Sequence, residues 1–194
     1  MISIFANKTV LQISCVFLIV LLAGCSGSSN PDDDFDGPFL NLDGEQDSAP
    51  TLTSGTWEFA SRFTASDIGS YAGGSLTGVY FYLTNRPDAA TVKIYGAGSA
   101  NTPGGLLFSA NMTASLRANR WNRFDFSSVV PLGTNDIWIS LEVSLPNGGR
   151  TVGCDAGPAK ANGDWLYIAA DGWRTYRDRA GESVNWNLRG IVAE

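Results

Sequence analysis

The sequence contains no histidine among its 194 residues. Every mechanism that depends on an imidazole is therefore excluded, including a Ser-His-Asp triad, a Cys-His pair and a His-ligated zinc or haem. Charge is also scarce, because only 16% of the residues are charged, against about 25% in a typical domain. The net charge of −6 leaves no excess of basic residues for phosphates, so no nucleic-acid partner is expected. A hydrophobic content of 44% with six tryptophans argues against a disordered chain.

Cysteine is nearly absent as well. Cys15 lies inside an apolar N-terminal segment, Cys25 lies at the end of that segment, and Cys154 stands alone in the remainder. The remainder can therefore form no internal disulfide. Without a histidine to activate it, Cys154 is not expected to be a nucleophile, and it is either a small buried hydrophobe or a free thiol.

The N-terminus has the organisation of a signal peptide. Lys8 precedes an apolar run over residues 10–23, which is shorter than the about 20 residues of a membrane span. We therefore assign residues 1–24 to a signal peptide and exclude them from the fold. An ordinary signal peptide, or a signal anchor with a chance cysteine, remains the alternative to the lipid-modified signal described next.

The segment ends in Leu22-Ala23-Gly24-Cys25, which resembles the lipobox of bacterial lipoproteins. The resemblance implies cleavage before Cys25 and acylation of that residue, so that the chain is anchored to a membrane by lipid. In that family, an aspartate directly after the cysteine is a retention signal for the inner membrane. Ser26 occupies this position here, which implies an outer-membrane lipoprotein whose face, periplasmic or surface, is open.

Residues 25–50 are expected to be a disordered tether. Seven acidic residues and no basic residue lie in 26–50, whereas residues 51–194 contain twelve acidic and twelve basic residues. Like charges repel and keep such a segment extended. The acidity of the chain therefore belongs to the tether, and the folded domain is expected over 51–194.

A calcium loop is one alternative for part of this tether. Asp32, Asp34, Asp36 and Gly37 match positions 1, 3, 5 and 6 of the D-x-D-x-D-G pattern, and Asp43 falls at position 12. However, Asp43 replaces the usual glutamate, and no flanking helices are evident. A solvated acidic spacer is the other interpretation, and we expect no further cofactor or metal.

Beyond residue 51, apolar and polar residues alternate in short runs that are separated by Gly, Asn, Pro and Asp. This pattern predicts an all-β antiparallel sandwich or barrel of about eight strands. One helical turn is expected over 65–71. The expected strands cover 56–63, 76–83, 90–95, 105–110, 120–126, 136–145, 164–169 and 184–192.

Residues 63–194 resemble the jelly-roll accessory domains of secreted and surface-anchored bacterial proteins. The resemblance implies a jelly-roll-like β-sandwich, often associated with carbohydrate binding or adhesion, and it transfers no catalytic residue. The segments that carry it include LTGVYFY at 76–82, VKIY at 92–95, WNRF at 121–124, IWISL at 137–141, GCDAGP at 153–158, GDW at 163–165, GW at 172–173 and NWNLRG at 185–190.

The outward faces of the expected strands suggest a ligand site. In 136–145, the odd-numbered residues from Ile137 to Leu145 form a core face, and Trp138 and Glu142 lie on the other face. Aromatic rings with nearby polar groups suit a sugar. Cross-strand pairs on a solvated sheet explain the same residues without a ligand. The candidate ligand-binding residues are Tyr80, Tyr82, Trp138, Glu142, Asp155 and Trp173.

Two of these predictions carry further detail. Asp155 lies in a Gly- and Pro-rich turn, where its carboxylate either caps backbone N–H groups or meets a ligand or ion. Trp138 and Trp173 are expected to be partly exposed, and Trp57 is left undecided. The tryptophans expected in the core are Trp121, Trp165 and Trp186.

Three functions follow from the sequence. The first is a non-catalytic glycan-binding or adhesive module anchored in the cell envelope. The second is a structural envelope lipoprotein that docks a protein partner and has no small ligand. The third, an enzyme acting on polysaccharides, is not expected, because no spaced motif is present. It would need two facing carboxylates from among Glu58, Glu142, Asp155 and Asp164.

Overall fold

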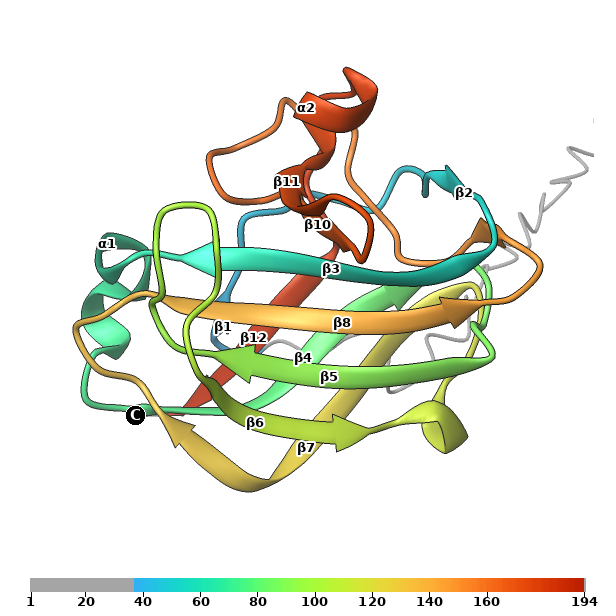
Figure 1. Ribbon diagram of the computed structural model, residues 1–194. Coiled ribbons are helices and arrows are strands. Elements are labelled where there is room, and N and C mark those ends of the chain that lie inside the picture. Colours follow the sequence, from blue (N-terminus) through green and yellow to red (C-terminus); the bar gives the residue numbers. More distant parts are fainter. Residues whose placement is uncertain (1–36, 194) are drawn as a thin grey trace, which may run out of the picture.

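The alternating segments form strands with one buried and one outward face. In strand β8 (Ile137–Leu145), every odd-numbered residue is buried, as predicted. The structure is a computed structural model and describes residues 37–193. These residues fold into two large antiparallel sheets that pack face to face, and a separate two-stranded sheet; the six-stranded sheet lies in front of the four-stranded sheet in Figure 1.

The four-stranded sheet has the order β1-β12-β4-β7, and the six-stranded sheet has the order β11-β10-β3-β8-β5-β6. The first sheet contains β1 (Phe39–Leu40), β12 (Leu188–Ala193), β4 (Ser75–Leu83) and β7 (Arg120–Pro131). The second contains β11 (Gly172–Thr175), β10 (Trp165–Ile168), β3 (Gly55–Phe63), β8, β5 (Ala89–Tyr95) and β6 (Leu106–Asn111).

This strand order is that of a jelly roll. Strands β1, β12, β4 and β7 face strands β3, β8, β5 and β6, and the chain crosses between the sheets so that all pairs are antiparallel. Eight strands in two sheets are the standard content of this architecture. The prediction of a jelly-roll-like sandwich of about eight strands is therefore confirmed.

The N-terminal boundary of the domain lies earlier than predicted. Strand β1 falls inside the segment that we assigned to the tether, and it pairs with β12. Leu40, Leu42 and Ala49 are buried with it. Apolar residues at these positions were hidden by the acidic composition of the segment, so the boundary at residue 51 is wrong. The predicted signal peptide, Cys25 and the aspartates at 32, 34 and 36 lie outside the described residues.

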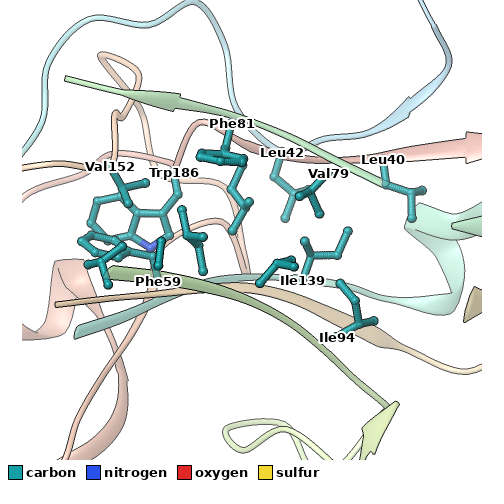
Figure 2. Packing of buried hydrophobic residues seen from close by; sticks show 14 of the residues in the cluster. Leu40, Leu42, Phe59, Val79, Phe81, Ile94, Ile139, Val152 and Trp186 are labelled. Carbon is teal, nitrogen blue, oxygen red and sulfur yellow. The ribbon is translucent and has the colours of Figure 1, made fainter. Parts of the chain in front are cut away.

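The core fills the space between the two sheets (Figure 2). Trp186, which is fully buried as predicted, meets Phe59 edge to face with ring centroids 5.0 Å apart. Gly190 lies where β12 crosses Ile139 and Leu76, and a Cβ atom there would collide with both side chains. A larger residue at this position would therefore force the ends of the Ile139 and Leu76 side chains to shift.

A hairpin and short elements complete the fold. The hairpin of β10 and β11 extends the six-stranded sheet beyond β3 and leads into α2 (Tyr176–Ala180). The predicted turn at 65–71 forms α1 (Ala65–Ile68) and a 3-10 turn, Gly69–Tyr71, and a second 3-10 turn covers Thr113–Ser115. β2 (Thr51–Leu52) pairs with β9 (Gly149–Arg150). No helix in residues 37–193 is long and apolar enough to span a membrane.

Candidate functional site

Two carboxylates lie opposite each other on the outward face of the six-stranded sheet. Glu58 on β3 and Glu142 on β8 are cross-strand partners, and like charges in such positions destabilise a sheet. Lys93 on the next strand, β5, offsets this repulsion. Its Nζ lies 3.2 Å from Glu58 Oε2 and 2.7 Å from Glu142 Oε2.

Glu58 is the fixed member of this group. Its side chain is only 5% exposed. Oε1 accepts hydrogen bonds from the Tyr95 hydroxyl, at 2.8 Å, and from the Ser140 hydroxyl. A buried charge is tolerated only when it is paired and hydrogen-bonded, and three donors meet this condition here. Glu58 therefore fixes the positions of the Lys93 and Tyr95 side chains on this face of the sheet.

Two of the three partners of Glu58, Tyr95 and Lys93, hold their protons more tightly than usual. Burial raises the pKa of Tyr95 well above its ordinary value, and the bond to Glu58 raises it further. Burial lowers the pKa of Lys93, but the bonds to Glu142 and Glu58 outweigh this effect and leave the pKa raised. The group therefore contains one ammonium and a neutral phenol at neutral pH.

A hollow lies over this group. Its volume is about 380 Å³, and its lining combines three aromatic rings with the ionised groups: Glu58, Lys93, Tyr95, Glu142, Tyr167 and Trp173. Tyr167 and Trp173 face each other across the β10–β11 pair, with ring centroids 5.4 Å apart. The predicted partial exposure of Trp173 is confirmed. The inserted hairpin therefore supplies the aromatic side of the hollow.

Trp138 does not reach this surface. The structure buries it completely beneath Trp165 and Trp173. The indole N–H donates to the Ala97 carbonyl in the loop between β5 and β6, at 3.1 Å, and the Arg62 guanidinium lies over the ring. The prediction that Trp138 is partly exposed is therefore wrong, because the sequence did not indicate what covers this part of the sheet.

Tyr80 and Tyr82 lie on the other side of the molecule. They point outward from the four-stranded sheet, since they alternate with buried Val79, Phe81 and Leu83. Tyr80 is itself buried there, stacked 4.8 Å from the Trp121 ring, and Tyr82 is half-buried. The predicted residues are therefore divided between two opposite faces, and only Glu142 and Trp173 line the hollow.

Trp121 takes part in this second face rather than in the core. It is partly exposed, so its predicted burial is wrong, whereas Trp165 and Trp186 are buried as expected. The Arg189 guanidinium lies 4.2 Å from the Trp121 ring centroid and pairs with Asp43 at 2.8 Å. We call Asp43, Arg189 and Trp121 the arginine clasp.

The clasp also bears on the calcium interpretation. Both oxygens of Asp43 accept from Arg189 Nε, and Oδ2 also accepts from Asn187 Nδ2. The side chain of Asp43 is fully buried. The carboxylate expected at position 12 of a calcium loop is thus bound to the sheet. In residues 37–193, no group of three acidic, cysteine or histidine residues could hold a metal ion.

The carboxylate of Asp155 has a structural role in its turn. Its carboxylate accepts from the backbone N–H groups of Gly44, Gly157 and Asn185, and from the Asn185 side chain, at 2.8–2.9 Å. Of the two predicted alternatives, the structure therefore shows the backbone cap. Cys154, next to it, is a buried free cysteine, and burial raises the pKa of its thiol.

The four carboxylates that we considered for catalysis do not converge. Asp164, directly before β10, is buried against the first turn of α2, where it accepts from the Arg177 backbone N–H at 2.9 Å. Burial raises the pKa of Asp164. Asp155 caps its turn, so only Glu58 and Glu142 come together.

The prediction missed Lys93, Tyr95 and Tyr167 as site residues. The alternation around Val92 and Ile94 already indicated that Lys93 and Tyr95 point outward. No signal in the sequence showed which strands would lie beside β5.

The chain matches no protein-family model, no curated protein and no solved structure. The geometry of the outward sheet faces is therefore the basis for the proposals that follow.

Proposed function

We propose that this protein is a non-catalytic glycan- or polysaccharide-binding module, adhesive in character, and that the hollow over Glu58, Lys93 and Glu142 is its binding site. The observation that carries the proposal is the position of Trp173 and Tyr167 beside half-exposed polar groups. Sugars present apolar C–H faces that pack on aromatic rings, and hydroxyls that need convergent donors and acceptors.

A binding role is favoured over hydrolysis by the position of Lys93. In a glycosidase, the scissile bond lies between two carboxyl groups. Here the Lys93 ammonium bonds to Glu58 and Glu142 at once and occupies the space between them.

The test is a titration of the purified full chain, in a detergent without a sugar headgroup, with a panel of polysaccharides. Tryptophan fluorescence reports binding, because Trp173 borders the hollow and contacts Trp138. We expect a saturable change in the wild type, and we expect Trp173→Leu, which lacks the reporting indole, to show no binding by titration calorimetry. Tyr82→Leu is the matched control on the opposite face and is expected to bind normally. A flat response from the folded wild-type chain across neutral and acidic polysaccharides would reject the proposal.

We further propose that the chain is an outer-membrane lipoprotein anchored through Cys25, as the lipobox resemblance implies. Cells that express the chain with radiolabelled palmitate provide the test. Cys25→Ser should remove the label, whereas Cys15→Ser, which lies inside the predicted signal peptide, should retain it. Equal labelling of both variants would contradict lipid attachment at Cys25.

A second candidate function, docking of an envelope protein, is favoured by a separate observation. The exposed large hydrophobic residues of the described chain are Leu106, Leu107 and Val129, each more than half exposed. They lie on β6 and β7, the edge strands on one side of the two sheets. Such a patch is typical of an interaction site. A photo-crosslinker at position 107 should give one discrete adduct in the envelope, and the same group at Lys160, which is exposed in a loop outside β6 and β7, should not.

A further inference from the structure

Glu142 and Lys93 form a donor–acceptor pair at the open side of the hollow. The side chain of Glu142 is 34% exposed and that of Lys93 is 19% exposed. Glu142 Oε2 accepts the Lys93 bond at 2.7 Å. Oε1 has no hydrogen-bond partner within residues 37–193. An ammonium has three donors, of which Glu58 and Glu142 take two. One charged acceptor and one charged donor therefore remain side by side for a ligand.

The hydrogen bonds of buried Glu58 hold this pair in place. Glu58 is bound by Lys93, Tyr95 and Ser140, and β3, β8 and β5 are neighbours in the middle of the sheet. A long lysine side chain normally loses much rotational freedom when it binds a ligand. Here that freedom is already lost in the free protein, so the pair is preorganised.

Two adjacent hydroxyl groups on a sugar ring match this arrangement. Each hydroxyl is both a donor and an acceptor, and neighbouring ring hydroxyls lie about one hydrogen-bond length apart, as do the two ionised atoms. One hydroxyl can donate to Glu142 while its neighbour accepts from Lys93, so that both bonds are charge-assisted. The sugar ring would then lie beside Trp173 and Tyr167.

We propose that the Glu142–Lys93 pair recognises a vicinal diol of a neutral pyranose. This inference rests on the proposed function and adds the chemical class of the ligand. Two carboxylates and one ammonium give the group a net negative charge. A sugar carboxylate or sulfate in place of either hydroxyl would meet Glu142 with a like charge. Acidic polysaccharides are therefore disfavoured at this site.

The test compares neutral polymers that differ in their diols. The full chain is titrated with an α-1,6-glucan, a β-1,4-glucan, a β-1,4-mannan and a β-1,3-glucan, the last of which has no adjacent ring hydroxyls along its chain. The polymer that binds best is then oxidised with periodate, which cleaves vicinal diols, and reduced with borohydride so that no aldehyde reacts with Lys93. Polymer treated with borohydride alone is the control.

We expect oxidation to weaken binding by about tenfold or more, which is the loss expected when charge-assisted hydrogen bonds are removed. The β-1,3-glucan should be the weakest ligand. Glu142→Gln should weaken binding similarly, whereas Lys160→Gln, at an exposed position away from the hollow, should not. Glu142→Asp, which keeps the charge, should retain part of the affinity.

The outcomes separate the two proposals. Binding that survives periodate oxidation, or that is unaffected by Glu142→Gln, overturns diol recognition and leaves glycan binding standing. Tighter binding of an acidic polysaccharide than of any neutral one by the wild-type chain also overturns it. Failure of every polysaccharide to bind overturns the proposed function and this inference together.

Discussion

The two outward faces of the sandwich are built from the same kinds of residue, but they differ in how exposed their charged groups are. Each face places a buried carboxylate beneath a basic side chain and aromatic rings. On the four-stranded sheet, Asp43 meets Arg189, which lies on Trp121. On the six-stranded sheet, Glu58 meets Lys93 below Tyr95 and Trp173.

The difference is how far a carboxylate remains exposed: the side chain of Asp43 is fully buried, whereas that of Glu142 is not. In the arginine clasp, Asp43 takes Arg189 and Asn187, and the planar guanidinium stacks on an indole. On the other face, a second carboxylate, Glu142, shares the ammonium and remains one-third exposed. A fully buried carboxylate that is paired with its cation, as on the four-stranded sheet (the closed face), stabilises the fold. A pair that leaves one carboxylate partly exposed, as on the six-stranded sheet (the open face), can also bind a ligand. The composition of a surface alone does not distinguish the two.

The largest expected loss of stability comes from a substitution in the arginine clasp of the closed face. Arg189→Met leaves Asp43 buried and without its cation, so the free energy of unfolding should fall by about 3 kcal/mol. Urea unfolding of the full chain measures this change. Arg174→Met, which removes an exposed ion pair with Asp171, should cost only about 0.5 kcal/mol. Equal losses in both variants would show that the clasp contributes no more than a surface pair.

The next effect concerns the buried part of the open face. Glu58→Gln removes the charge that Lys93, Tyr95 and Ser140 share, and should lower the free energy of unfolding by about 2 kcal/mol. Urea unfolding again provides the measurement, with Glu45→Gln at an exposed position as the control. An unchanged midpoint for Glu58→Gln would mean that this network does not stabilise the fold.

Alkaline pH should affect the open face more than the clasp. The folded-state pKa values of Tyr95 and Lys93 lie above their ordinary values of 10.0 and 10.5. The native state therefore holds protons that the unfolded chain releases, and stability is lost as the pH rises above about 10. The free energy of unfolding, measured from pH 9 upward, should fall less steeply in Tyr95→Phe than in the wild type. Parallel curves would contradict this assignment.

The smallest effect on stability is expected at the partly exposed carboxylate, Glu142. Glu142→Gln should change the free energy of unfolding by no more than about 0.5 kcal/mol, because the side chain is partly solvated. The same variant should nevertheless lose glycan affinity. A large destabilisation would show that Glu142 stabilises the fold as the buried carboxylates do, and the two faces would then not differ in this respect.

Much of the fold could be predicted because period-two alternation is a local property. Strands β3, β4, β5 and β8 were predicted to within a residue at each end, and the buried face of β8 was assigned in full. Strand β1 was missed because two apolar residues in an acidic segment carry no periodicity. Its partner, β12, lies at the other end of the chain.

The candidate site was only partly predictable for a related reason. Alternation shows that a side chain points outward, but it does not show which sheet the strand joins or what covers it. Tyr80 and Glu142 were therefore placed together and lie on opposite faces. Trp138 points outward as expected, yet the loop that follows β5 and the hairpin of β10 and β11 cover it.

The way the chain enters the domain has a mechanical consequence. Strand β1 runs antiparallel to β12, and the Val192 N–H donates to the Pro38 carbonyl. A force applied through the residues before Gly37 would therefore first load this short ladder, and then the ion pair of Asp43 with Arg189. Both contacts would have to rupture before residues 37–43 could separate from β12, so together they would resist detachment of this segment under load.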